Sequence, residues 1–112
     1  MQISEDTPLT EFLVTAYESG AIWVNRVAYH HSIILTPHDV TTWDGDFQKL
    51  LKPDIELVLI GTGNVSKIIL PEQLALFYEK KIGVEVMNTQ AACRTYNLLA
   101  NEGRKVIAGL LV

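Results

Sequence analysis

The sequence has a single cysteine, no long apolar run and no excess of positive charge. One cysteine cannot form a disulfide within the chain, and a reducing compartment fits this usage. No apolar run approaches the roughly 20 residues that span a bilayer. The opening "MQISEDTPLT" resembles neither a signal peptide nor an Arg-rich mitochondrial presequence. These absences predict a cytoplasmic protein without a membrane span.

The sequence also lacks the patterns of common ligand sites. Its net charge is −4 and its Lys and Arg residues are scattered, which speaks against a nucleic-acid protein. "GTG" at 61–63 fails as a dinucleotide fingerprint, because Ser66 takes the third glycine position and no helix follows directly. His30, His31 and His38 match no zinc spacing, and adjacent residues of a strand point to opposite faces. We therefore expect no cofactor and no metal.

A length of 112 residues favours one domain, 1–112, with a core large enough to be stable without disulfides. The first half, to about Thr42, is strand-like. Residues 12–25 predict two strands around a turn at Ser19-Gly20, and 31–36 predict a third strand. A loop at 37–46 and one helical turn at 47–51 follow. Trp43 in the loop has two interpretations, burial in the core or an exposed anchor for a partner, and burial is favoured.

The second half alternates strands with helices. Apolar runs at 55–63 and 105–112 predict buried strands, and "GVEVM" at 83–87 predicts the strand between them in the chain. "KIIL" at 67–70 predicts a short extra strand. Pro71 opens a helix with Leu74, Phe77 and Tyr78 as its buried stripe, and Gly83 is expected as its left-handed cap. Asn88 or Thr89 caps a second helix that ends at Gly103. The order strand, helix, strand, helix, strand implies three parallel strands with right-handed crossovers.

Two loops leave the carboxyl ends of these parallel strands, where ligands of open α/β sheets bind. One is Gly61-Thr62-Gly63 and the other is Asn88-Thr89, whose free helix N–H groups favour an anion. The alternative is that glycines only make a tight turn, with at least one at positive φ, and that Asn or Thr only caps a helix. Both interpretations remain open at this point.

Cys93 follows in the first turns of that helix. Its neighbour Arg94 could lower the thiol pKa, but no base is visible nearby in the sequence, and a lone cysteine beside alanines is typical of a small buried side chain. We expect Arg94 and Asn97 to share a helix face and to border the crevice by Gly61 and Thr62. The candidate pocket therefore comprises Gly61, Thr62, Gly63, Asn88, Thr89, Cys93, Arg94 and Asn97, and no catalytic residue is identified.

"VLIGTG", then Pro71, then "GVEVMNTQAACRTYNLLANEGRKVIAGLLV" resembles the small Mth-type domain family of unknown function. The resemblance covers nearly the whole chain. It implies a compact α/β domain with a mixed central sheet, a parallel β-α-β-α-β carboxyl-terminal half and a small antiparallel sheet from the amino-terminal half. It implies no established activity, cofactor or metal. Asn88 stands where the family often has Asp, which weakens a proton-transfer role there.

Two functions follow as hypotheses. The leading one is a non-enzymatic binding or assembly module with a protein partner, because the family includes a mitochondrial assembly factor for respiratory complex I and the sequence shows no nucleophile–base pair. The alternative is a binder of a small polar or anionic ligand, or an enzyme, that uses the crevice at 61–63 and 88–97.

Overall fold

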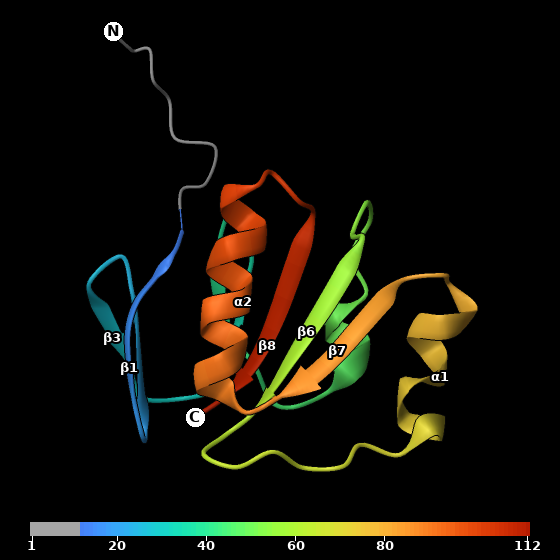
Figure 1. The fold of residues 1–112 in the computed structure, drawn as a ribbon, viewed down its shortest axis with the longest axis horizontal. Helices are drawn as coiled ribbons and strands as arrows, with labels where there is room; N and C mark the ends of the chain where they lie inside the picture. Colours follow the sequence, from blue (N-terminus) through green and yellow to red (C-terminus); the bar gives the residue numbers. More distant parts are fainter. Residues whose placement is uncertain (1–11) are drawn as a thin grey trace, which may run out of the picture.

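The computed structural model describes residues 12–112, so the first eleven residues of the predicted domain lie outside the described residues. Two sheets and two α-helices make up this part of the chain (Figure 1). The first half holds five strands and a 3₁₀ helix: β1 (Val14–Glu18), β2 (Ala21–Val24), β3 (Val27–Tyr29), β4 (Ile33–Leu35), β5 (Val40–Thr42) and η1 (Phe47–Leu50). The second half holds β6 (Leu57–Thr62), α1 (Pro71–Glu79), β7 (Gly83–Met87), α2 (Thr89–Asn101) and β8 (Val106–Leu111).

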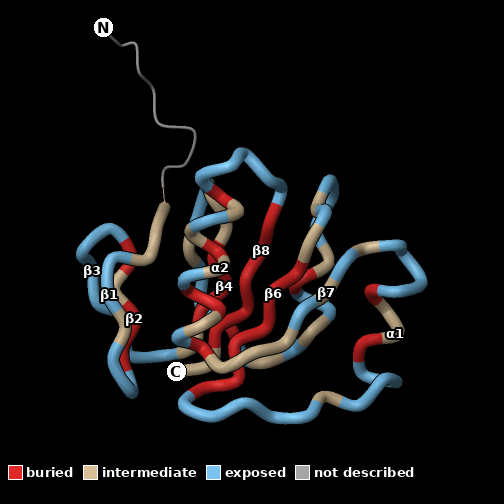
Figure 2. The backbone as a smooth tube through the Cα atoms, viewed as in Figure 1, coloured by how far each residue is buried: buried red, intermediate tan, exposed pale blue. Residues whose placement is uncertain are grey.

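The central sheet has five strands in the order β5-β4-β8-β6-β7. β6 pairs in parallel with both β7 and β8, while β4 pairs antiparallel with β8 and with β5. The mixed sheet and its three parallel strands confirm the fold predicted from the alternating strands and helices. β8 and β6, the two six-residue strands, lie in the interior of the sheet and are buried at five of their six residues (Figure 2).

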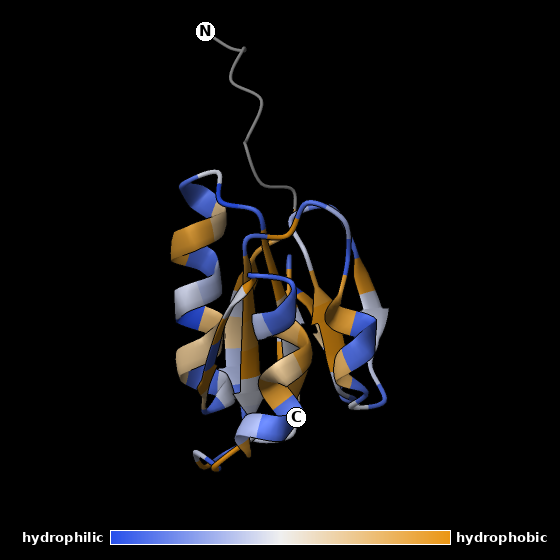
Figure 3. Ribbon diagram, turned by 90° about the vertical axis from the view of Figure 1, so that its right-hand side faces the viewer, coloured by the Kyte–Doolittle hydropathy of each residue, from blue (hydrophilic) through white to orange (hydrophobic). Residues whose placement is uncertain are grey.

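Each face of this sheet carries its own apolar cluster, because neighbouring residues of a strand point to opposite faces. On one face, Leu59 and Ala108 pack against Tyr96 of α2. On the other face, Val58 and Ile107 pack with Phe77 of α1 and with Trp43. The sheet therefore lies between helical layers, as its edge-on view shows (Figure 3).

The small sheet, β1-β2-β3, is antiparallel and lies beside α2 (Figure 1). Ile22 and Val24 of β2 reach the same apolar cluster as α2. The Tyr96 hydroxyl on α2 donates to the Phe12 carbonyl at 2.9 Å, just before β1. This sheet confirms the antiparallel unit predicted for the first half, although β4 and β5 from that half join the central sheet.

Three short elements differ from the sequence prediction. Residues 67–70 form no strand. The backbone of Leu70 bonds instead to Gln73 in the first turn of α1, and Ile68 is 91% exposed. β3 and β5, only three residues each, lie in segments where we predicted no strand. Their pairing depends on β2 and β4 being held in place by the core, which a local pattern does not encode.

The end of α1 also differs. Gly83 is not a left-handed cap but the first residue of β7, opposite Leu57, and the left-handed residue is Lys81 with φ 59°. Tyr78 is 56% exposed, whereas Leu74 and Phe77 are buried. The buried stripe of α1 is narrow because this helix packs on β7, the last strand of the sheet. No helix within residues 12–112 is long and apolar enough to cross a membrane.

Candidate functional site

Thr89, the first residue of α2, closes the carboxyl end of the parallel sheet. Its side chain is buried, and its hydroxyl donates to the Leu111 carbonyl at 2.6 Å and accepts from Gly63 N–H at 2.8 Å. Its own N–H donates to the Gly63 carbonyl at 2.9 Å. One residue thus joins the ends of β6, α2 and β8.

The two glycines of the 61–63 turn have different tasks. A Cβ built on Gly61 would lie 2.8 Å from Thr89 Oγ1 and 3.0 Å from Thr89 Cα, so this position must be glycine to let α2 approach β6. Gly63 has φ +91° and open space around it. Its backbone confirms the prediction that at least one of these glycines has positive φ.

The N–H groups of Thr89, Ala91 and Ala92 at the amino terminus of α2 are bonded within the chain itself. Asn88 caps the helix, because its side-chain oxygen accepts from Ala91 N–H at 2.8 Å, and Thr89 N–H is bonded to Gly63. The buried Thr62 hydroxyl donates to the Val65 carbonyl at 2.7 Å. The polar groups expected to bind an anion therefore hold the loop, the helix and the sheet together.

Arg94, Asn97 and Cys93 lie elsewhere on α2, on its side toward β1. The Asn97 carboxamide accepts from Val14 N–H at 2.9 Å and donates to the Val14 carbonyl at 2.8 Å, so it does not bond the 61–62 loop as expected. A shallow hollow of about 230 Å³ is lined by these three residues, Gln90 and 14–17 of β1. The single crevice expected from the sequence is thus two separate places, because Asn97 faces β1 and Thr89 faces β6.

Cys93 is a buried thiol. Loss of solvent raises its pKa to about 12, although nearby Arg94 acts in the opposite direction. A thiol with that pKa stays protonated at neutral pH and is a weak nucleophile. The interpretation of Cys93 as a small buried side chain agrees with this burial.

A larger hollow lies at the opposite end of the sheet, and the sequence analysis did not predict it. It has a volume of about 560 Å³ and lies among 36–39, 52–55 and 103–106, beside the start of β8. Lys52, Lys105, Asp39 and Asp54 give it charges of both signs. These residues come from three distant loops that show no shared pattern, so no local signal could have indicated this hollow.

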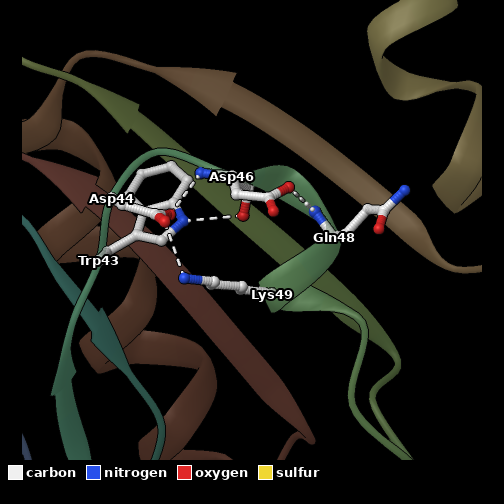
Figure 4. A network of polar contacts seen from close by, with 5 residues as sticks. All are labelled: Trp43, Asp44, Asp46, Gln48 and Lys49. Atoms are coloured by element: carbon white, nitrogen blue, oxygen red, sulfur yellow. Dashed lines mark hydrogen bonds and ion pairs between the residues drawn. The ribbon is translucent and has the colours of Figure 1, made fainter.

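Trp43 is buried in the core, which confirms the favoured interpretation, and it is not an exposed anchor for a partner. Its indole N–H donates to the Asp46 carbonyl at 2.9 Å, and Asp46 also caps η1 by accepting from Gln48 N–H (Figure 4). Asp44 and Lys49 form an exposed ion pair at 2.7 Å across this turn (Figure 4). The hydrogen bond from Lys49 holds the pKa of the Asp44 carboxyl below its usual range.

No group of three or more His, Cys, Asp or Glu side chains within residues 12–112 is placed to hold a metal ion. His30, His31 and His38, the candidates considered from the sequence, belong to no such group.

Comparison with known proteins identifies relatives over nearly the whole chain. A family model described as a protein of unknown function (DUF498/DUF598) matches residues 14–111. The cow protein named NADH dehydrogenase [ubiquinone] 1 alpha subcomplex assembly factor 3 is 31% identical over 97% of this chain. The chain spans 65% of the length of that relative. A Francisella tularensis protein named 13 kDa major membrane protein is 31% identical over 95% of both chains.

Solved structures share the fold. A Bordetella parapertussis crystal structure superposes with a TM-score of 0.85 at 37% identity, covering 91% of this chain and 96% of the other. The solution structure of a Bordetella pertussis Mth938-like domain has a TM-score of 0.77 at 32% identity, covering 99% and 90% of the two chains. The resemblance inferred from the sequence to the small Mth-type domains is confirmed.

Proposed function

We propose that this chain, which belongs to the family of proteins of unknown function DUF498/DUF598, is a protein-binding module that acts in the assembly of a respiratory NADH dehydrogenase. The observation that carries the proposal is the similarity, at 31% and 32% identity, to cow and human proteins named as assembly factors of that enzyme. Those proteins are longer than this chain. The similarity therefore covers the proposed binding module and not the whole assembly factor.

The interior of the candidate crevice supports binding of a protein over chemistry on a small molecule. The hydroxyls of Thr62 and Thr89 are bonded to the backbone of neighbouring segments. The Cys93 thiol is buried and held protonated. An enzyme that uses a nucleophile needs an activated group that substrate can reach, and these groups are neither activated nor exposed.

The outer surface supplies a second line of support. Val65, Ile68, Leu70 and Tyr78 are large apolar side chains that are more than half exposed, and they follow one another closely in the chain. Apolar residues that gather on a surface are typical of contacts with other proteins. These exposed apolar side chains support the prediction of a protein partner. The cytoplasmic location stays a prediction.

The test is deletion of the gene in its native host, with assembled NADH dehydrogenase measured on native gels and by NADH oxidation in isolated membranes. We expect less assembled enzyme in the deletion strain and recovery when the wild-type gene is returned. Return of the Cys93→Ala variant should restore assembly equally, because the thiol has a packing role. Normal amounts of the enzyme in the deletion strain would contradict the proposed function.

A further inference from the structure

β7 is an open edge of the central sheet. Within residues 12–112 it is the last strand in the order β5-β4-β8-β6-β7 and pairs only with β6 (Figure 1). The opposite edge strand, β5, has three residues, whereas β7 has five. A long unpaired edge is a template for another strand, and proteins usually shorten or cover it.

The backbone groups at this edge can be identified from one hydrogen bond. Gly83 N–H donates to the Glu56 carbonyl at 3.0 Å, so Gly83 faces β6. Because successive residues of a strand point their N–H and C=O groups to opposite sides, Val84 and Val86 point theirs outward. No hydrogen bond within residues 12–112 satisfies these outward groups. The edge therefore offers two donors and two acceptors.

Apolar residues flank this edge. The Thr62 hydroxyl lies 2.7 Å from the Val65 carbonyl and 3.3 Å from the Met87 carbonyl, so the connection from β6 to α1 starts beside the end of β7. That connection carries Ile68 and leads into α1, which packs on β7. Figure 2 shows residues 64–70 and β7 as exposed or intermediate, unlike the central strands. Val84 and Val86 face the α1 cluster, so a strand added here has apolar neighbours on that face.

Glu85 gives the edge a charge. It is exposed, lies at the centre of β7 and has no ion pair within residues 12–112. Two copies that pair antiparallel along the whole of β7 would place Glu85 opposite Glu85, and like charges directly opposite destabilise a strand pair. A cation in a different chain would instead pair with this carboxylate. The charge thus favours a foreign strand over a second copy.

Resting on the proposed function, we propose that an extended segment of a partner protein binds β7 as a sixth strand of the central sheet. Its central residue is Lys or Arg, opposite Glu85, and the residues on either side are apolar and lie opposite Val84 and Val86. Main-chain hydrogen bonds supply affinity, and the alternating side chains supply specificity.

Hydrogen exchange and a defined peptide test the edge directly. In the free protein, the amides of Val84 and Val86 should exchange on the order of tenfold faster than those of Glu85 and Met87, which face β6. A soluble peptide with the central residues Val-Lys-Val should shift the NMR signals of Val84 and Val86 and slow their exchange. The same peptide with Val-Glu-Val should bind about threefold more weakly or worse. Equal protection of all four amides, or equal binding of both peptides, would overturn the proposal.

Variants in the deletion strain test the edge in the cell. Val86→Pro removes an outward N–H, which an edge strand tolerates, and Glu85→Lys reverses the charge without touching the backbone. Thr42→Pro is the matched control, because it places the same ring at an outward position of the other edge strand, β5. Thermal melts select variants that fold. We expect Thr42→Pro to restore the enzyme, and Val86→Pro and Glu85→Lys to restore less than half as much.

These outcomes separate the two proposals. If the wild-type gene has no effect on assembly, the proposed function fails. If the wild type restores assembly and both β7 variants do so equally well, the function stands and the sixth strand does not. A photo-crosslinker at Val86 should attach to a partner segment in which a Lys or Arg lies between two apolar residues. A photo-crosslinker at Leu98 should not attach to that segment. Attachment to a second copy of this chain, or to a segment without the cation, overturns the proposed occupant.

Discussion

The carboxamide of Asn97 makes two hydrogen bonds to the backbone of Val14, one to its N–H at 2.9 Å and one to its carbonyl at 2.8 Å. A neighbouring strand would satisfy the same pair of groups. The Asn97 side chain therefore bonds to the start of β1 as a neighbouring strand would. These two bonds attach the small sheet to α2.

Asn97→Asp should make that attachment pH-dependent. A carboxylate can accept from Val14 N–H but repels the Val14 carbonyl, so we expect a loss of about 1–3 kcal/mol at pH 7. A protonated carboxyl can donate to that carbonyl, so the folded-state pKa of the introduced group is raised above its unfolded value of about 3.9. The variant should be closest to wild type below that unfolded value and lose stability as pH rises through the folded pKa. Urea unfolding from pH 4 to 7 measures this, and a constant difference from wild type would contradict it.

Gly61 and Gly63 should respond differently to substitution. Gly61→Ala places a Cβ 2.8 Å from Thr89 Oγ1 and 3.0 Å from its Cα, and should cost about 1–3 kcal/mol. Gly63→Ala meets no neighbour but forces a side chain to φ +91°, at about 1 kcal/mol. Asn tolerates positive φ better than Ala, so Gly63→Asn should be milder than Gly63→Ala, while Gly61→Asn should be at least as severe as Gly61→Ala. Thermal melts of the four variants compare them, and the same order at both positions would refute the assignment.

Cys93 should be unreactive until the protein unfolds. A chromogenic thiol reagent at pH 8 should modify the native protein slowly and the urea-unfolded protein at once, because burial raises the thiol pKa to about 12. Rapid modification of the native protein would contradict this.

The same pKa shift has a consequence for stability. The protonated thiol contributes fully below its unfolded pKa of about 8.5, and this contribution is lost as pH rises toward about 12. Wild type should therefore lose stability faster than Cys93→Ala above pH 8.5. Comparing the two variants cancels the other groups that titrate in this range, and parallel pH curves would count against the shift.

Gly109 makes room for the indole of Trp43. A Cβ at this position would lie 2.9 Å from Trp43 Cη2 and 3.0 Å from Leu50 Cδ1. Gly109→Ala should displace the ring, cost about 1–3 kcal/mol and shift the fluorescence of Trp43 to longer wavelength, measured in a Trp23→Phe background. Gly103→Ala is the control, since it strains a backbone at φ +78° with nothing within 4 Å, away from the turn that bonds the indole, and should leave the emission unchanged. An unchanged emission wavelength for Gly109→Ala would contradict the close contact between residue 109 and the Trp43 ring.

Much of the fold could be read from local patterns. The apolar runs at 55–63 and 105–112 identified the two central parallel strands, because a strand covered on both faces must be apolar throughout. The short segment 83–87 identified the third, which is half exposed at the edge. Pro71 and Gly103 marked a helix start and a helix end, since one fixes φ and lacks an N–H and the other accepts a left-handed turn. Burial of Cys93 also followed from its small neighbours.

The candidate site was predicted only in part. The sequence placed Gly61, Gly63 and Thr89 at the carboxyl ends of strands, and the structure has them at those positions. It could not show that the Thr89 hydroxyl is used by the chain itself, because its partners are 22 and 26 residues away. It also joined Asn97 to the wrong loop, because helix periodicity defines which residues share a face and not which segment that face meets.

The sequence by itself determined the two helices, the three strands that alternate with them in the second half and the apolar faces that these elements bury, since such patterns depend on residues within one or two turns of each other. Only the tertiary structure decided which strand lies at the edge, where α2 meets β1 and which polar groups stay open. Those features depend on contacts between segments far apart in the chain, such as the pairs Asn97 with Val14 and Tyr96 with Phe12. The free energy of such contacts depends on the whole packed core, which no local stretch of sequence contains.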